Sequence, residues 1–292
     1  MKQVKSLSIL AIVLVILMAC ASKKTVTNPS VTEPETTIEK LDEDQLKKLV
    51  SQLEQRDNEA NGLMLLRAPE YFVSNAPKLA VDEMESFVEL LQRSKQGNDA
   101  IMELCKRADV SIDGGVEAAI NMYSNRPERT IENLKSRREN DNNYSLLIST
   151  FQKQIEINKE KEYTIPEGDL VYYSHRSFGG MLRGTHYEIQ KNGNGETFLT
   201  TNANFRDMRD TTFVVPDTAL VHIKKIIVDY KMYELAPLYV TPFLVYDAPS
   251  TSISATFSCG QRINSEGQQA APHNKGVWII SDYLSSLLPT RE

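Results

Sequence analysis

The sequence predicts an α+β fold, with an N-terminal helical region followed by a largely antiparallel β-sheet domain that carries two helices. Apolar residues recur at helical spacing from Leu41 to Glu162. From Tyr163 onward the pattern changes to short strand-like segments separated by turn residues, which form two hairpin systems with a helix between them and another at the end. Hairpins give antiparallel pairs, and helices kept apart from them in the sequence are typical of the α+β class.

The first 20 residues have the order charged, apolar, small residue, cysteine. Lys2 and Lys5 precede an apolar run that starts at Leu7 and closes with Leu17-Met18-Ala19-Cys20. A run of this length is too short to cross a bilayer, which takes about 20 residues, but it suits the apolar part of an export signal. The closing stretch resembles the lipobox of a bacterial lipoprotein.

This resemblance implies that residues 1–19 are a lipoprotein signal peptide and that cleavage occurs before Cys20. The Cys20 sulfur then carries a diacylglyceryl group and its amino end a fatty acyl group, such as palmitate. Several acyl chains anchor firmly where a single chain binds only reversibly. Membrane lipid is therefore an expected partner, and the expected location is the cell envelope, at the outer membrane and facing either the periplasm or the cell surface. An ordinary signal peptide with a chance cysteine at its end is the alternative.

Residues 20–40 are expected to form a disordered tether between the lipid and the folded part. The segment is rich in Thr, Pro and Glu and has almost no large apolar side chains. Such a composition cannot bury enough surface to offset the entropy lost on folding.

Residues 41–162 are expected to form a helical domain. One helix carries an apolar stripe from Leu46 to Leu53, and a second begins at Asp82 and stops near Gly97, where Asn98 caps a third. Further helices follow the Asp113-Gly-Gly turn and the Asn125-Arg-Pro127 start signal, with a polar break over 140–143 before the last one.

Residues 163–292 are expected to form the α+β domain. The strongest hairpin signal is Asn192-Gly-Asn-Gly195, because Asn and Gly accept the positive φ of tight turns. Helices are expected from Pro216 to Tyr230 and from Gly276 to Leu288. The predicted strands cover residues 169–175, 184–190, 196–202, 211–215, 252–257 and 262–265.

The back half is similar to an uncharacterised domain of lipoproteins and small exported proteins of Gram-negative bacteria. The matching features are a Tyr-Ser-X-X-X-Gly-Gly-Met hairpin at 173–181, a Phe-Ser-X-Gly turn at 257–260, and a Pro-then-Gly stretch at 272–276 that leads into Tyr283-Leu-X-X-Leu287. The chain departs from that pattern by having Ile253-Ser-Ala where Trp is usual and Cys259 where Asp is usual. The resemblance implies a fold and supplies no activity.

Charge and cysteine usage exclude several classes of function. The chain has 33 Lys and Arg against 39 Asp and Glu, so no nucleic-acid partner is expected. Besides Cys20 it has only Cys105 and Cys259, which form either one disulfide or two free thiols. Without a CxxC motif or clustered Cys and His residues, no zinc site and no cofactor are expected.

Two weak candidate sites remain. Cys259 and His273 are the only Cys and His that are close in the back half, and a thiol protease needs a thiolate activated by a nearby imidazole. Cys259, however, falls in a predicted turn without an oxyanion-hole motif. His175 and His186 flank the turn at Gly179-Gly180. They form the corner of a metal site if they pair directly, whereas a register shifted by one residue puts them on opposite faces of the sheet.

The sequence therefore favours a membrane-anchored envelope lipoprotein that acts as a non-enzymatic binding or structural module. Its expected partner, besides lipid, is a protein or a peptidoglycan or other glycan in the envelope. The alternative is a cell-envelope hydrolase that uses Cys259 and His273, and a deep polar pocket with convergent carboxylates or histidines would favour it.

Overall fold

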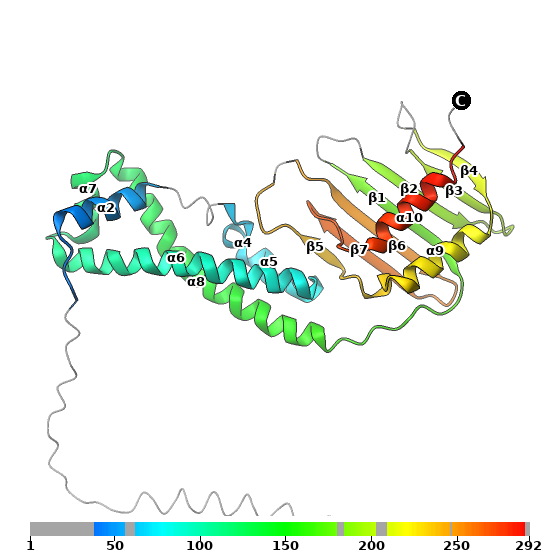
Figure 1. Cartoon of the computed structure of the whole chain (residues 1–292), viewed down its shortest axis with the longest axis horizontal. Coiled ribbons are helices and arrows are strands. Elements are labelled where there is room, and N and C mark those ends of the chain that lie inside the picture. Colours follow the sequence, from blue (N-terminus) through cyan, green and yellow to red (C-terminus); the bar gives the residue numbers. More distant parts are fainter. Residues whose placement is uncertain (1–37, 56–61, 180–183, 203–208, 246, 290–292) are drawn as a thin grey trace, which may run out of the picture. The chain divides into compact units, whose positions relative to one another are not determined.

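The computed structural model describes residues 38–55, 62–179, 184–202, 209–245 and 247–289. They form a series of helices followed by a seven-stranded sheet with further helices (Figure 1), which confirms the predicted α+β class. By its contacts the chain divides into Met1–Glu39 and Lys40–Glu292. The predicted signal peptide and almost all of the predicted tether lie outside the described residues.

The first described helix begins with a reciprocal cap. The Asp42 carboxylate accepts a hydrogen bond from the Gln45 backbone N–H at 2.8 Å, and the Gln45 side chain accepts one from the Asp42 N–H at 3.0 Å. The helices of this front part are α2 (Glu43–Glu54), α4 (Met64–Arg67), α5 (Pro69–Asn75), α6 (Val81–Ser111), α7 (Gly115–Tyr123) and α8 (Pro127–Lys159), with a 3-10 turn at Ala76–Lys78.

Two predicted helix breaks are wrong, because α6 runs straight through Gly97 and Asn98, and α8 runs straight through residues 140–143. A glycine in a helix costs about 1 kcal/mol relative to alanine, which packing between two long helices readily offsets. Asn98 does not cap a new helix. Its side chain is buried and donates a hydrogen bond to the Arg137 carbonyl of α8 at 3.3 Å.

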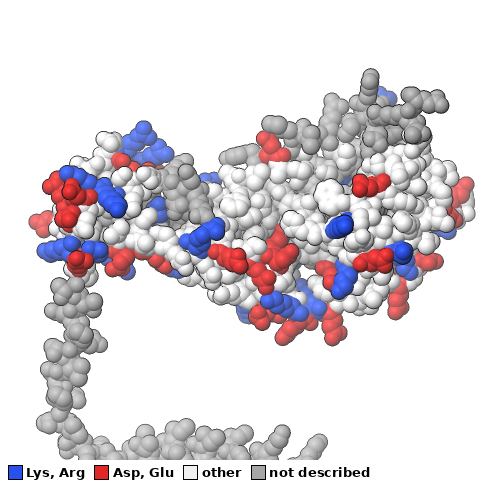
Figure 2. Space-filling view, viewed as in Figure 1, with Lys and Arg blue, Asp and Glu red and all other residues white. Residues whose placement is uncertain are grey.

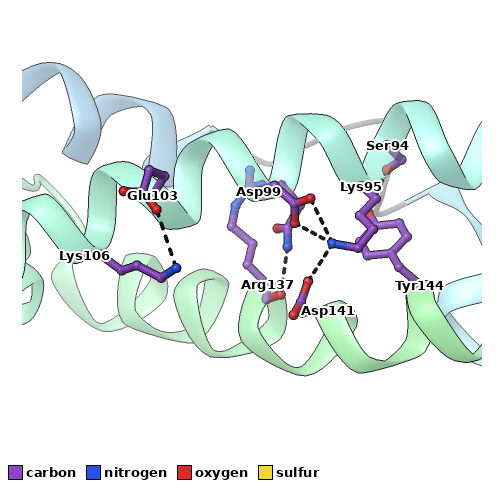
Figure 3. A network of polar contacts seen from close by, with 9 residues as sticks. Ser94, Lys95, Asp99, Glu103, Lys106, Arg137, Asp141 and Tyr144 are labelled. Atoms are coloured by element: carbon purple, nitrogen blue, oxygen red, sulfur yellow. Dashed lines mark hydrogen bonds and ion pairs between the residues drawn. The ribbon is translucent and has the colours of Figure 1, made fainter. Parts of the chain in front are cut away.

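The polar residues that suggested those breaks form a layer between two apolar clusters. One cluster joins α2 and α7 to the C-terminal half of α6 and the start of α8. The other joins α4 and α5 to the N-terminal half of α6 and the C-terminal half of α8. In the layer between them, Ser94 and Tyr144 share a 2.7 Å hydrogen bond, and Lys95 contacts Asp99 at 2.7 Å and Asp141 at 3.3 Å (Figure 3). The sequence pattern changes there because the helices pass from one core to the next.

The sheet has the strand order β4-β3-β2-β1-β6-β7-β5, and every neighbouring pair is antiparallel except β5 and β7. The two predicted hairpin systems thus belong to one sheet, joined by pairing of β1 with β6. The strands are β1 (Leu170–Phe178), β2 (Thr185–Lys191), β3 (Thr197–Thr201), β4 (Thr211–Val215), β5 (Leu238–Val240), β6 (Ser250–Phe257) and β7 (Arg262–Gln268).

The predicted turn between β2 and β3 is confirmed. Gly195 has φ +87°, which favours glycine, and its N–H donates to the Asn192 carbonyl at 3.1 Å. The Asn192 side-chain oxygen accepts hydrogen bonds from the backbone N–H groups of Asn194 and Glu196, each at 2.9 Å. The turn therefore fixes the register of β2 with β3.

One face of the sheet is covered by α9 (Thr218–Asp229) and α10 (Lys275–Ser286), which lie side by side on it (Figure 1). Both helices agree with the prediction. Their apolar stripes pack on inward side chains of the central strands, among them Tyr173, Ile189 and Ile253, which are all at most 1% exposed. This cluster is the core of the sheet part.

The short strand β5 connects the helices to the sheet and was not predicted. Leu238 forms a parallel bridge with Leu79, and the Met64 N–H donates to the Pro242 carbonyl at 2.7 Å. Leu238 and Val240 belong to the same apolar cluster as α4, α5 and α6. The predicted domains 41–162 and 163–292 therefore contact each other at this strand, and independent folding of the second one stays a prediction.

Candidate functional site

The side of the sheet opposite α9 and α10 is polar, and we call it the open face. The inward residues of β6 are Thr251, Ile253, Ala255 and Phe257, so strand alternation directs its serines and Thr256 to the other side. None of the open-face side chains of β1, β2, β6 and β7 belongs to an apolar cluster of the described residues. They are Tyr172, Ser174, Arg176 and Phe178 of β1; His186, Glu188 and Gln190 of β2; Ser250, Ser252, Ser254 and Thr256 of β6; and Arg262, Asn264, Glu266 and Gln268 of β7.

The open face is organised by polar contacts between neighbouring strands. Arg176 of β1 contacts the Glu188 carboxylate of β2 at 3.0 Å, and the Tyr172 hydroxyl donates to the same carboxylate oxygen at 3.4 Å. On the other side of β1, the Ser254 hydroxyl of β6 donates to the side-chain oxygen of Asn264 on β7. These contacts hold donors and acceptors in fixed positions over four strands.

An open cleft of about 580 Å³ lies at the end of this face where β1 ends and β6 begins. Its floor is a row of side chains that the pairing register places directly beside one another, with Arg176 next to His186 on one side and next to Ser252 on the other, and Glu266 beyond Ser252. At about 4.8 Å between strands, this row spans roughly 14 Å. Phe178, 53% exposed, stands at the rim.

Asn202 fixes the edge of the cleft at the start of β2. Its side-chain oxygen accepts a hydrogen bond from the His186 N–H at 2.9 Å, and its amide donates to the Gly184 carbonyl at 3.0 Å. The His186 ring lies 3.6 Å from the Asp210 carboxylate. Residues outside β2 thus contact both the backbone and the side chain of His186, Asn202 the former and Asp210 the latter.

The structure does not bring His175 and His186 together. His175 pairs with Tyr187 while His186 pairs with Arg176, so the register is shifted by one residue from direct pairing and the two rings lie on opposite faces. The His175 ring lies under α10, 2.9 Å from the Ser281 hydroxyl, and burial lowers the pKa of His175. Among the described residues no group of three or more His, Cys, Asp or Glu side chains is arranged to hold a metal ion.

Cys259 and His273 are also apart. Cys259 lies in the turn before β7 and His273 follows the end of β7, so the seven residues of that strand separate them by roughly 20 Å. The exposed Cys259 sulfur lies 2.8 Å from the Glu167 carbonyl oxygen and 3.2 Å from the Gln261 side-chain oxygen, and its single S–H proton is donated to one or the other. The His273 ring packs edge-on against Tyr239. The geometry of a thiol–imidazole dyad is not present.

Both cysteines outside the signal region are free thiols. Cys105 is buried in the helical part, where burial raises its pKa to about 11, and Cys259 is exposed. Of the two alternatives that the sequence left open, the structure has the unpaired one. Cys20 lies outside the described residues, and within those residues no helix has both the length and the apolar character that crossing a bilayer requires.

Charged side chains of both signs are interspersed on the side of the molecule that carries α9 and α10 (Figure 2). Much of the sheet part is uncharged in that view. The expectation that this chain has no nucleic-acid partner stays a prediction.

Comparison of the sequence with models of known protein families gives no match, and comparison with curated proteins gives none either. The argument for function therefore rests on the residues themselves. Sequence reasoning missed the open face as a site, although the alternation of hydroxyl and apolar residues over 252–257 is its signal. It also missed β5, which is only three residues long, and with it the cleft beside Glu83 that is described below.

Proposed function

We propose that this chain is a lipid-anchored envelope protein, held at the outer membrane through acylated Cys20, and that it acts as a non-enzymatic binding module. The open face of the sheet is its binding surface, and a glycan strand is its ligand. The observation that carries this proposal is the row of polar side chains from His186 to Glu266 at the floor of an open cleft.

The chemistry of that row suits a sugar chain. Hydroxyl groups such as that of Ser252 both donate and accept, as sugar hydroxyls do, while Arg176 offers only donors and Glu266 only acceptors. Phe178 provides an exposed ring against which the apolar side of a sugar ring can pack. A cleft that is open rather than enclosed suits a long polymer better than a small molecule, whose sites bury most of the ligand.

A binding role is favoured over hydrolysis because, in the described row, the one imidazole (His186) and the one carboxylate (Glu266) stand at opposite ends, with Arg176 and Ser252 between them. The only Cys–His pair that the sequence suggested is divided by the length of β7. Anchoring is supported by the lipobox resemblance of residues 17–20 and by the polar composition of residues 21–38, which suits a tether.

Co-sedimentation with insoluble glycans tests the proposal. The full chain in detergent is mixed with purified peptidoglycan, with chitin and with cellulose, and the pelleted fraction is measured. We expect the chain to pellet with at least one of them, and we expect Ser252→Leu to weaken this by about tenfold, because leucine blocks the floor and removes a donor.

The matched control is Lys225→Ala on α9, an exposed residue of the covered side. It should pellet as the unmodified chain does. Circular dichroism of both variants verifies the fold. Equal pelleting of Ser252→Leu and the unmodified chain, or failure to pellet with any glycan, would contradict the open face as a glycan site.

A further inference from the structure

A second cleft, of about 520 Å³, lies between the first turns of α6 and the segments that follow β5 and β7. It is separate from the open-face cleft and shares no lining residue with it. One wall is apolar, with Pro242 and the 43% exposed ring of Phe243. The other wall is α6, which contributes acidic residues and Arg93.

Glu83 is the unusual residue of this cleft. It is the third residue of α6 and only 8% exposed, although a glutamate is rarely buried without a partner. The Val240 backbone N–H forms a hydrogen bond with its carboxyl group. The Oε2 atom is buried and has no hydrogen-bond partner among the described residues. A buried carboxyl oxygen without a hydrogen-bond partner costs free energy, so this atom is left unsatisfied in the free protein.

Charged groups of both signs lie around Glu83 in this cleft. On α6, Asp82 and Glu89 line the same cleft together with Arg93, and from the segment after β7 comes His273. Burial raises the pKa of Tyr239 of β5 to about 12, and the nearby carboxyl groups of Asp82 and Glu83 add to this rise. Burial raises the pKa of Glu83 to about 8, with the Val240 N–H opposing this and Asp82 adding to it. A positive charge would reverse the shift.

We propose that this cleft binds a basic side chain of a partner peptide, with its ammonium or guanidinium group on the Glu83 carboxylate. The alkyl part of the side chain lies along Pro242 and Phe243, since lysine and arginine bury their stems on apolar surface. The ring of Phe243 adds an attraction for the cation. This site does not depend on the glycan proposal, because it uses different residues in a different cleft.

The binding event includes a proton balance. The Glu83 carboxyl is largely protonated in the free protein at neutral pH, and it must lose its proton to the solvent to form an ion pair with the ligand. Binding at pH 7 therefore releases close to one proton for each ligand bound. The apparent affinity for the basic ligand rises as the pH increases from 6 to 8. Below the pKa of Glu83 the rise is up to about tenfold for each pH unit.

Titration calorimetry with a small probe tests this inference. The full chain in detergent is titrated with Nα-acetyl-L-lysine N-methylamide, in buffers of different ionisation enthalpy, and with the uncharged norleucine analogue as the control ligand. We expect the lysine probe to bind, with proton release at pH 7, and the norleucine probe to bind at least tenfold more weakly.

Glu83→Gln keeps the shape of the side chain and should reduce binding of the lysine probe about tenfold or more. Glu85→Gln is the matched control, because Glu85 is exposed and pairs with Lys159 at 2.8 Å on the surface of the helices. It should leave binding unchanged. Equal affinity for the two probes, binding without proton release, or full affinity of Glu83→Gln would overturn the proposal. If Glu83→Gln does not fold, the probe comparison and the proton count decide it on the unmodified chain.

Discussion

The buried carboxyl of Glu83 predicts an unusual dependence of stability on pH. In the unfolded chain this group titrates near its ordinary value of 4.5, whereas in the folded protein burial raises its pKa to about 8. Between these values the folded protein keeps a proton that the unfolded chain has lost. Stability from this group is therefore fully present below pH 4.5 and is lost as the pH rises through 8.

The size of the effect follows from the two pKa values. A difference of one bound proton changes the free energy of unfolding by about 1.4 kcal/mol for each pH unit. From pH 5 to pH 8 the contribution of Glu83 should fall by about 4 kcal/mol. That is a large share of the 5–15 kcal/mol by which native proteins are typically stable.

Urea unfolding of the full chain at pH 5, 6, 7 and 8 measures this contribution when the wild type is compared with Glu83→Gln. Glutamine does not titrate, so the wild type should lose stability relative to the variant by about 1.4 kcal/mol per pH unit. Glu85→Gln, which removes an exposed carboxylate from the same helix, should follow the wild type. Parallel curves for the wild type and Glu83→Gln would refute the reasoning and show that Glu83 is ionised in the folded protein.

Three further predictions concern other parts of the chain. Cys20→Ser removes the thiol that lipidation requires, so the chain should lose its label from a fatty-acid probe and leave the membrane fraction; unchanged labelling would rule out the anchor. Ser94→Ala and Tyr144→Phe should each cost about 1 kcal/mol in urea unfolding, because each removes the buried 2.7 Å hydrogen bond that the two hydroxyls share, and the double variant should cost clearly less than the sum. Strictly additive costs would mean that the shared hydrogen bond contributes nothing. The alkylation rate of Cys259 should be the same with and without His273→Ala, since β7 separates the two residues; a slower rate in the variant would support the hydrolase alternative.

The sheet was largely predictable because its signals are local. The turn at 192–195 and the alternation within β6 appear in the sequence as they do in the structure. What connects the hairpin systems is the pairing of β1 with β6, between residues about 80 positions apart, and no local pattern encodes it. The same is true of β5, which pairs with β7 over only three residues and depends on Leu79 at its other side.

The helix breaks were predicted wrongly for a related reason. Gly97 and the run at 140–143 are weak helix formers by themselves, and local propensity is the only information that one sequence gives there. In the structure the two stretches belong to helices that pack against each other, and buried polar contacts such as that of Asn98 replace the expected caps. Tertiary contacts decided both cases.

The candidate sites could not be predicted from local sequence patterns for the same reason. Whether two histidines on a hairpin share a face depends on a shift of one residue in the register. The sequence between Gly179 and Gly184 does not define that register. The burial of Glu83 depends on β5, which comes about 155 residues later in the chain. No spacing rule could have identified that carboxyl as different from its neighbour Glu85.

The way β5 is bound to the helices has a consequence for self-association. A sheet edge with unpaired backbone groups can add a strand from another molecule. At the β5 edge the bridge to Leu79 already occupies such groups, and just beyond β5 the Met64 N–H bonds to the Pro242 carbonyl. At the other edge, β4 pairs only with β3 among the described strands, and Val214 is 71% exposed there. Two molecules that met edge to edge through β4 would form a closed symmetric pair, and growth into a fibre would stop at that pair because, of the two sheet edges formed by the described strands, the β5 edge is already occupied.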